Sequence, residues 1–271
     1  MDTIRASRPD WHGHLLLIHH TEQERRAGVA TWVRCGLELG EKILYIEPPD
    51  EPAERSLVNV LAEQQVVVDG AAARGQLQIL RAHEDIYSAD GLTDAVDHAL
   101  AQGYRGVRFS AEAPTAREVL SGTAHQHLEW ATDLLCRTRP VSVLCQYSAD
   151  LAREALPEVS AMHGDGVRET LLHTAPRAGG IAIRGEVDVS NHDVLRCVVQ
   201  AATLGAADSF VVDLSELEFL DVSGARALLE ATKSYRQSGG GVRLRKPQHL
   251  VKRVLDLCCM DQAGGLRVDH S

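Results

Sequence analysis

The chain has 271 residues, a formal net charge of −10 and 44% apolar residues, enough hydrophobic material for one large or two modest cores. The acidic balance argues against nucleic acid as a partner, because a phosphate backbone is bound by clustered cations. The chain starts without a hydrophobic signal core, and no run approaches the ~18–20 apolar residues of a membrane span. We therefore expect a cytoplasmic protein that has no membrane partner.

The first part of the chain alternates strands with helices. We expect strands at 15–18, 42–46, 77–80, 107–109, 141–147 and 170–173, and helices at 21–38, 53–63, 92–102, 116–138 and 150–160. Thr21 and Glu24 form a capping box at the start of the first helix, and Gly40 stops it. Because the strands are continuous apolar runs, they indicate a parallel sheet covered on both faces, a three-layer α/β fold.

The loop after the first strand has no phosphate-binding motif. It contains no Gly-x-x-x-x-Gly-Lys-Ser/Thr sequence, and the helix opens with Glu22 and Glu24, whose charge opposes a phosphate. Gly-x-Ser-x-Gly and His-Glu-x-x-His are also absent from the sequence. We predict no catalytic residues, no cofactor and no ATP hydrolysis.

The second part repeats the alternation on a smaller scale. Strands are expected at 181–185, 210–214, 242–245 and 266–268, with helices at 191–203, 223–237 and 248–258. Pro176 and the paired glycines at 179–180 are typical of a turn or linker. We therefore predict a first domain at 1–173, a linker at 174–180 and a second α/β domain at 181–271.

The stretch from Asp213 to Gly224 carries the clearest functional signal. Asp221 precedes a segment rich in helix formers and is placed to cap that helix. Ser223 then lies among unpaired backbone N–H groups at the positive end of the helix dipole. A phosphate there would be stabilised by the helix and would add a charge of roughly −2. This is the physical basis of a docking surface that phosphorylation can switch.

The motifs of the second domain resemble a known family. Gly185 to Asp188, Asp213 to Ser215, Phe219 to Gly224 and Pro247 to Leu257 are, in this order, similar to the STAS domain of anti-sigma factor antagonists, over about 179–269. The resemblance implies a partner, an anti-sigma factor of the histidine-kinase-like ATPase fold, which phosphorylates a serine at the start of the second helix. It implies a docking surface made of Asp188, Ser190, Asn191, Asp221, Val222, Ser223 and Gly224. The alternative is that Asp188 and its neighbours are only solvated turn residues.

One position departs from this family. Its phosphorylated serine directly follows the aspartate, where this chain has Val222. Three interpretations stay open: Ser223 is a displaced phosphoacceptor, the domain docks but is not switched off by phosphorylation, or Ser223 is a helix-capping hydroxyl in a domain with another role.

The first part resembles a second family. Gly36 to Tyr45, Gly70 to Leu77, Gly103 to Arg108, Leu144 to Tyr147 and His163 are, in order, similar to the MEDS sensory domain over about 11–165. That resemblance implies a RecA-like core without a phosphate loop, and a sensing or protein-binding role for small, largely apolar ligands. The family's His-x-Cys is replaced here by His12-Gly13-His14.

Six polar residues of the first part are candidates for binding such a small-molecule ligand. We expect them near the strand ends, where open α/β sheets bind ligands: His12, His14, Glu129, Cys145, Tyr147 and His163. The alternatives are a metal site or plain hydrogen-bonded packing. Their spacing fits no zinc pattern, so we predict no metal. The histidines at 125 and 127 are interpreted as ordinary helix-face residues.

Together these features predict a non-enzymatic regulator, an anti-sigma factor antagonist controlled by an N-terminal sensory domain. The alternative function is a degenerate nucleotide- or metal-dependent enzyme in the first domain. A third is a structural module whose STAS domains stack in an assembly. The partner switch predicts a monomer or a homodimer.

Overall fold

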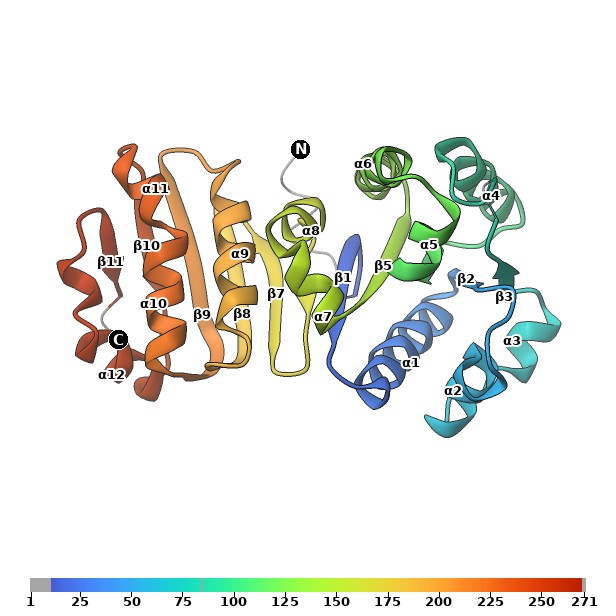
Figure 1. Ribbon diagram of the computed structural model, residues 1–271, viewed down its shortest axis with the longest axis horizontal. Coiled ribbons are helices and arrows are strands. Elements are labelled where there is room, and N and C mark those ends of the chain that lie inside the picture. Colours follow the sequence, from blue (N-terminus) through green and yellow to red (C-terminus); the bar gives the residue numbers. More distant parts are fainter. Residues whose placement is uncertain (1–10, 84, 270–271) are drawn as a thin grey trace. The chain divides into compact units, whose positions relative to one another are not determined.

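The computed structural model describes residues 11–83 and 85–269. Within them the chain divides into two compact units, one from Trp11 to Ala152 and one that begins at Arg153 (Figure 1). None of the helices in the described part combines the length and hydropathy that a membrane span needs.

The N-terminal unit is built on a five-stranded parallel sheet. Its strands are β1 (His14–His19), β2 (Lys42–Glu47), β3 (Leu77–Arg81), β4 (Val107–Glu112) and β5 (Val141–Ser148). They lie in the order β1-β5-β4-β2-β3, and every neighbouring pair is parallel. Such connections need a helix between successive strands, as the sequence predicts.

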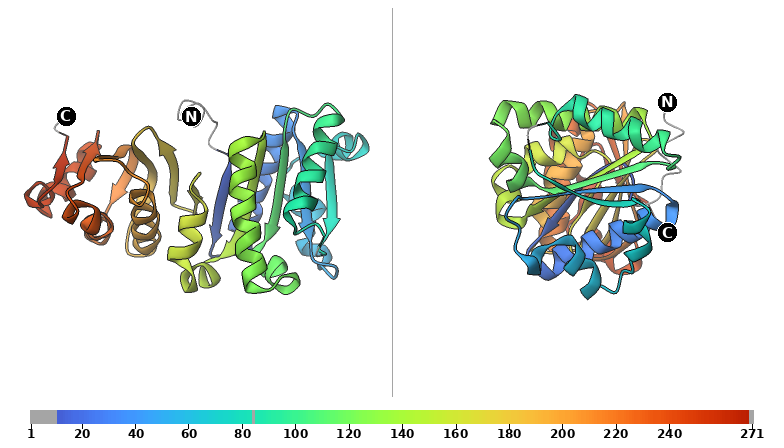
Figure 2. Two further views of the ribbon diagram at one scale, coloured as in Figure 1. Left: turned by 90° about the horizontal axis from the view of Figure 1, so that it is seen from above. Right: turned by 90° about the vertical axis from the view of Figure 1, so that its right-hand side faces the viewer.

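Helices cover both faces of this sheet (Figure 2, right). α1 (Glu22–Leu39), α2 (Leu57–Glu63) and α3 (Asp69–Ala73) share one core with β1 and β2. α4 (Ala89–Ala101), α5 (Ala113–Val119) and α6 (Gly122–Thr138) share the apolar clusters on the opposite face. The predicted three-layer arrangement is confirmed.

Local signals fix the ends of α1 as predicted. The Thr21 hydroxyl accepts a hydrogen bond from the Glu24 amide at 3.2 Å, and the Glu24 carboxylate accepts one from the His20 amide at 2.7 Å. Gly40 ends the helix with φ of 72°, a left-handed conformation that glycine adopts without strain.

Four predicted helices are in fact interrupted, among them 223–237, which is divided at Thr232 into 222–231 and 233–237. The segment 116–138 is divided between α5 and α6, because Leu120 is extended and Ser121 caps α6 by accepting from the Ala124 amide. The segment 150–160 is divided into α7 (Ala149–Glu154) and α8 (Leu156–Met162), with Pro157 in the first turn of α8. The segment 53–63 becomes a short 3-10 turn, η2 (Ala53–Arg55), followed by α2.

The described part of the C-terminal unit contains six strands. Its strands are β6 (Val167–Arg168), β7 (Leu172–Arg177), β8 (Gly180–Val187), β9 (Ser209–Leu220), β10 (Gly241–Arg245) and β11 (Leu266–Val268), in this spatial order. β8 to β11 pair in parallel, and β7 pairs antiparallel with both of its neighbours.

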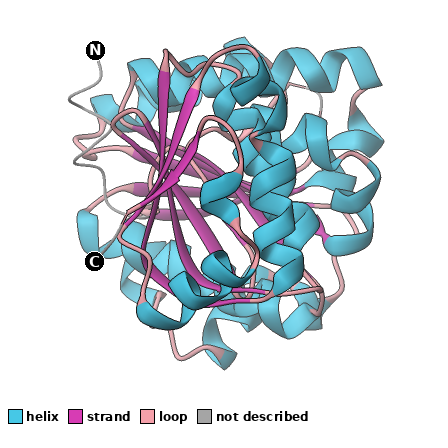
Figure 3. Ribbon diagram, turned by 90° about the vertical axis from the view of Figure 1, so that its left-hand side faces the viewer, coloured by secondary structure: helices cyan, strands magenta, loops and turns pink. Residues whose placement is uncertain are grey.

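The helices of this unit gather on one face of the sheet (Figure 2, left; Figure 3). α9 (His192–Thr203), α10 (Val222–Ala231) and α12 (His249–Leu257) pack there, joined by α8, α11 (Lys233–Gln237) and the turn η3 (Met260–Gln262). β10 shows the resulting alternation, because Val242 and Leu244 are buried while Arg243 between them is exposed.

Two predicted segments take another form. The predicted linker at 174–180 is the end of β7, a turn and the start of β8, so the strand predicted at 170–173 belongs to a hairpin. The boundary between the two domains stays a prediction. The strand predicted at 210–214 is longer and runs from Ser209 to Leu220 as β9.

Candidate functional site

A cavity of about 60 Å³ lies inside the N-terminal unit, between the sheet and α5 and α6. This volume exceeds the ~10–15 Å³ that one water needs, so it has room for a small molecule. The wall is mostly apolar and includes Ile46, Leu92, Phe109, Leu128 and Val143. Polar groups enter at His125, Glu129, Thr132, Cys145 and the two tyrosines Tyr87 and Tyr147.

The inner face of α6 supplies three of these six polar groups. His125, Glu129, Thr132 and Cys136 recur at helical spacing and are all buried. The exposed Trp130 and Leu134 lie on the outer side of the same helix. The polar stripe of α6 therefore faces the sheet, opposite to the usual arrangement of an amphipathic helix.

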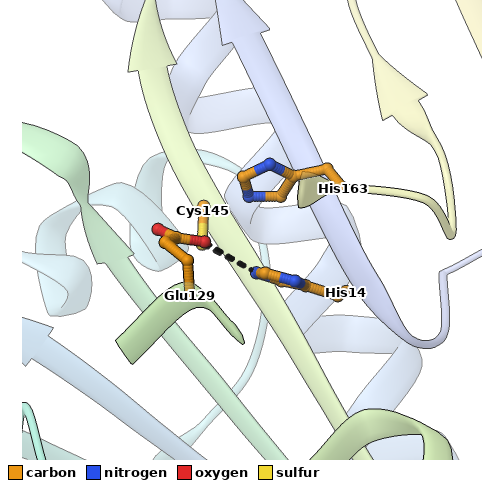
Figure 4. Close-up of side chains that lie close together, drawn as sticks. All are labelled: His14, Glu129, Cys145 and His163. Atoms are coloured by element: carbon orange, nitrogen blue, oxygen red, sulfur yellow. Dashed lines mark hydrogen bonds and ion pairs between the residues drawn. The ribbon is translucent and has the colours of Figure 1, made fainter. Parts of the chain in front are cut away.

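Three side chains from three elements converge beside the cavity (Figure 4). His14 Nε2 on β1 lies 3.2 Å from Glu129 Oε2 on α6 and 3.5 Å from Cys145 Sγ on β5. The register of β1 against β5 places them together, because His14 pairs with Val143, two residues before Cys145 and on the same face. His125 Nε2 lies 3.4 Å from the other oxygen of Glu129.

Burial changes the chemistry of two groups on the wall. Burial, together with the Glu129 carboxylate, raises the pKa of the Cys145 thiol well above its ordinary value. Burial also raises the pKa of Tyr87. The Tyr87 side chain is 6% exposed, and its hydroxyl has no hydrogen-bond partner among the described residues. A buried hydroxyl without a partner is costly, and a ligand in the cavity would satisfy it.

The structure brings part of the predicted ligand group together. His14, Glu129, Cys145 and Tyr147 lie at the cavity or beside it, as one group. His12 does not join them: it contacts Arg108 and Ser142 at 3.2 Å each, on the face of the sheet that α1 covers. The prediction that His12 belongs with His14 is wrong, because Gly13 has φ of 92° and redirects the chain between them.

His163 belongs to the C-terminal unit. Its ring is buried, Nδ1 lies 2.8 Å from the Val159 carbonyl oxygen, and the residue lines a second cavity of about 80 Å³ with Ser160 and Thr174. His14 is the first residue of β1 and so stands at the amino-terminal end of that strand.

Sequence reasoning missed three polar residues of the cavity wall, His125, Thr132 and Tyr87. His125 stands four residues before Glu129 and seven before Thr132, a helical repeat that signals a shared inner face. Tyr87 lies in the loop before α4, and no periodic signal points to it.

In the C-terminal unit, the predicted docking residues gather at one edge of the sheet. β8 and β9 end side by side, with Val187 paired to Leu220, and the Asp221 amide donates to the Val187 carbonyl at 3.1 Å. The residues that follow each strand, Asp188 and Asp221, are therefore neighbours at the start of α9 and α10.

Asp188 organises the loop before α9. Its Oδ1 accepts from the amide and the hydroxyl of Ser190 at 2.7 and 2.5 Å, and these hydrogen bonds hold the pKa of Asp188 below its usual value. Asn191 instead points inward: it is fully buried and donates to Glu169 and to the Glu186 carbonyl. The prediction that Asn191 belongs to the docking surface is wrong, because its amide is needed to satisfy buried polar groups.

The four residues at the start of α10, 221–224, have different roles. Asp221 caps the helix by accepting from the Gly224 amide at 2.8 Å, so Ser223 is not the capping residue. Gly224 is buried, and a Cβ there would lie 2.6 Å from Leu220 Cδ1 and 2.7 Å from Val187 Cγ1. Gly224 is therefore a packing residue and not a surface contact. Val222 is 52% exposed, and Ser223 is half-buried.

Comparison with known families assigns both units. A family model described as the methanogen/methylotroph, DcmR sensory domain (MEDS) matches residues 13–164. The chain belongs to the MEDS family. A second model, described as Mlab, STAS domain, matches residues 171–268, so the MEDS domain is followed by a STAS domain. The suspected fusion is confirmed.

Solved structures give weaker likenesses. The unphosphorylated anti-sigma factor antagonist SpoIIAA is 19% identical, with 37% of this chain and 89% of that chain covered and a TM-score of 0.31. The flagellar accessory protein FlaH of Methanocaldococcus jannaschii is 10% identical, with coverage of 66% and 79% and a TM-score of 0.44. The KaiC-like protein PH0186 of Pyrococcus horikoshii OT3 is 16% identical, with coverage of 65% and 80% and a TM-score of 0.44. No curated protein matches the chain.

Proposed function

We propose that this protein is a non-enzymatic regulator whose STAS domain binds an anti-sigma factor of the histidine-kinase-like ATPase fold, under the control of its MEDS domain. The observation that carries the proposal is the STAS match combined with the exposed edge at the starts of α9 and α10. We call this edge the docking corner and define it as Asp188, Val189, Ser190, Asp221, Val222 and Ser223.

The docking corner has the composition of a protein-binding surface. Val189 and Val222 are 70% and 52% exposed, and the carboxylates of Asp188 and Asp221 lie next to them. Apolar groups that a polar rim surrounds are typical of sites that another protein covers. The carboxylates would favour a partner with basic groups at matching positions.

Val222 sets how such binding is regulated. A side chain without a hydroxyl cannot accept a phosphoryl group, so phosphorylation at that position cannot release the partner. Control then falls to the MEDS domain. A ligand in its cavity regulates the corner only if it binds more tightly to one state of the protein than to the other.

Binding of the purified protein to the ATPase domains of anti-sigma factors from the same genome, measured by titration calorimetry, tests this proposal. We expect Val222→Glu to weaken the complex ~10–100-fold, because it replaces an apolar contact by a carboxylate that the partner would have to bury. Leu204→Glu is the matched control: Leu204 is 80% exposed and follows the other end of α9, and its substitution should leave affinity unchanged. Equal affinities of the wild type and Val222→Glu, or no binding to any such domain, would overturn the proposal.

A further inference from the structure

His14, Glu129 and Cys145 form a donor set that the proposed docking function does not use. They supply an imidazole nitrogen, a carboxylate oxygen and a sulfur, and these ligand atoms all lie within 4.8 Å of one another. His14 is fully buried, Glu129 is 5% exposed and the thiol of Cys145 lies on the cavity wall. Burying such groups together is unfavourable unless something compensates their polarity.

The separations suit one small metal ion. Bonds of ~2.0–2.3 Å in a tetrahedral zinc site place neighbouring ligand atoms roughly 3.3–3.7 Å apart. The His14 Nε2 atom lies 3.2 Å from Glu129 Oε2 and 3.5 Å from Cys145 Sγ, close to that spacing. The charges also balance, because one carboxylate and one thiolate neutralise a divalent cation in the protein interior.

A contact from His125 and the neighbouring cavity support the three candidate metal ligands. His125 Nε2, 3.4 Å from Glu129 Oε1, holds the second carboxylate oxygen and so orients the first. The cavity touches Glu129 and Cys145, and the unpartnered hydroxyl of Tyr87 lies on the same wall. Zinc with three protein ligands keeps one position open for water or a ligand.

We propose that the N-terminal unit binds one Zn²⁺ through His14 Nε2, Glu129 and Cys145 Sγ, with an open position that faces the cavity. This reverses the prediction of no metal, which rested on spacing along the chain and so could not detect ligands that tertiary structure brings together. On binding, the Cys145 thiol releases its proton to solvent as the sulfur–zinc bond forms, so affinity falls as the pH is lowered. The role of the ion in sensing rests on the proposed function, whereas its binding does not.

Cobalt and zinc binding to the full-length protein, free of any affinity tag, tests this site. Titration of the metal-free protein with Co²⁺ should give one equivalent per chain and a sulfur-to-cobalt charge-transfer absorption, and Zn²⁺ should displace the cobalt. Cys145→Ser should abolish that absorption, and His14→Ala and Glu129→Gln should weaken Zn²⁺ binding by ~100-fold or more, since even outer contacts of a metal site matter 10–100-fold. Apo-state circular dichroism verifies that each variant folds.

Two matched controls separate the site from adventitious binding. His127→Ala removes an exposed histidine from the same helix, and Cys197→Ser removes a buried cysteine from the C-terminal unit. Both should bind cobalt as the wild type does. Absence of saturable binding or of the charge-transfer absorption in the wild type would overturn the proposal without any variant, as would unchanged spectra in Cys145→Ser. A failure here leaves the docking proposal intact, because calorimetry with the anti-sigma factor domains measures a different surface.

Discussion

The two units place their polar chemistry differently. In the N-terminal unit, charged side chains are buried within the fold: Arg25, Glu41, Lys42, Glu47, Arg108 and Glu129. In the C-terminal unit, Asp165, Arg168 and Glu169 are buried near its start, whereas in the stretch 180–268, which the structure describes throughout, Asp213 is the one charged residue that is buried. In that stretch, the polar residues that resemble the family's docking surface lie at the exposed docking corner.

This contrast indicates different kinds of partner. Buried charge is retained only where ion pairs, hydrogen bonds or a bound group compensate it, so the N-terminal unit is suited to a small ligand or ion inside its core. The STAS part combines an apolar core with an exposed edge, and that arrangement suits a protein. Substitutions of buried charged residues, of a closely packed glycine and of an exposed residue of the docking corner test this contrast.

The largest effect is expected from Arg108→Met. The Arg108 side chain is fully buried, donates from Nε to Glu41, and lies 5.2 Å from the Trp32 ring centroid. Removing its charge leaves the buried Glu41 without its arginine, with the His12 ring 3.7 Å away, so the free energy of unfolding should fall by about 3–5 kcal/mol. All three tryptophans, Trp11, Trp32 and Trp130, lie in the N-terminal unit, so urea unfolding followed by tryptophan fluorescence reports on that unit.

Two further variants separate charge from general damage at Arg108. Arg105→Met, at an exposed position nearby, should change the free energy of unfolding by less than ~0.5 kcal/mol. The double variant Arg108→Met, Glu41→Gln should regain part of the loss, because no buried charge remains. If the single and double variants were equally unstable, the ion pair would not be the cause.

A smaller loss is expected in the other unit from Gly224→Ala. The new methyl group would overlap Leu220 and Val187, at 2.6 and 2.7 Å, and such overpacking destabilises by about 1–3 kcal/mol, less the gain in helix propensity. Hydrogen exchange of β9 should show the loss, while tryptophan fluorescence should not. Gly205→Ala, where a Cβ has no atom within 4 Å, is the control and should be close to neutral.

Acid should remove a specific contribution from the N-terminal unit. Partial burial alone raises the pKa of Glu22, but hydrogen bonds and charge from Arg25 and Arg26 lower it to about 2. Because the folded pKa is depressed, the stabilisation is present above the unfolded value of 4.5 and disappears as the pH falls toward 2.

The matching variant is Glu22→Gln. At pH 7 the wild type should exceed it by about 1 kcal/mol in free energy of unfolding, after allowance for solvent screening, and the difference should vanish near pH 2. Urea titrations between these values, followed by tryptophan fluorescence, measure it. Glu38→Gln, an exposed position at the other end of α1, should give no such pH dependence. A constant difference at every pH would show that the Glu22 charge contributes nothing.

Local signals predicted most of the fold, and long-range packing accounts for the errors. The capping box at Thr21 and Gly40 acts within one helix, so the sequence alone located α1. Ser121 and Gly122, a capping residue and a poor helix former, follow Leu120, but they do not by themselves show that the helix stops there. Among the site residues, Cys145 and His14 were candidates, but only strand register shows that they meet. Asn191 was assigned to the surface because its inward hydrogen bonds depend on Glu169, distant in sequence.

The smallest effect on stability, and the sharpest test of the docking corner, is expected from Val222→Ser. Val222 is 52% exposed, so the substitution should change the free energy of unfolding by less than ~0.5 kcal/mol. It places a hydroxyl at the first residue of α10, where the anti-sigma factor antagonist family carries its phosphoacceptor, and a phosphate there would be stabilised by the helix N-terminus. Incubation with ATP and the anti-sigma factor domain that binds the wild type should then phosphorylate the variant, and mass spectrometry should locate the group at residue 222. The added charge of roughly −2 beside Asp188 and Asp221 should release the partner.

The double variant Val222→Ser, Ser223→Ala is the control: it should be phosphorylated and released in the same way, and the wild type should remain unmodified. Phosphate on Ser223 of the wild type would instead show that Ser223 is the displaced phosphoacceptor. Phosphorylation by the kinase, and not the MEDS domain, would then regulate the docking corner.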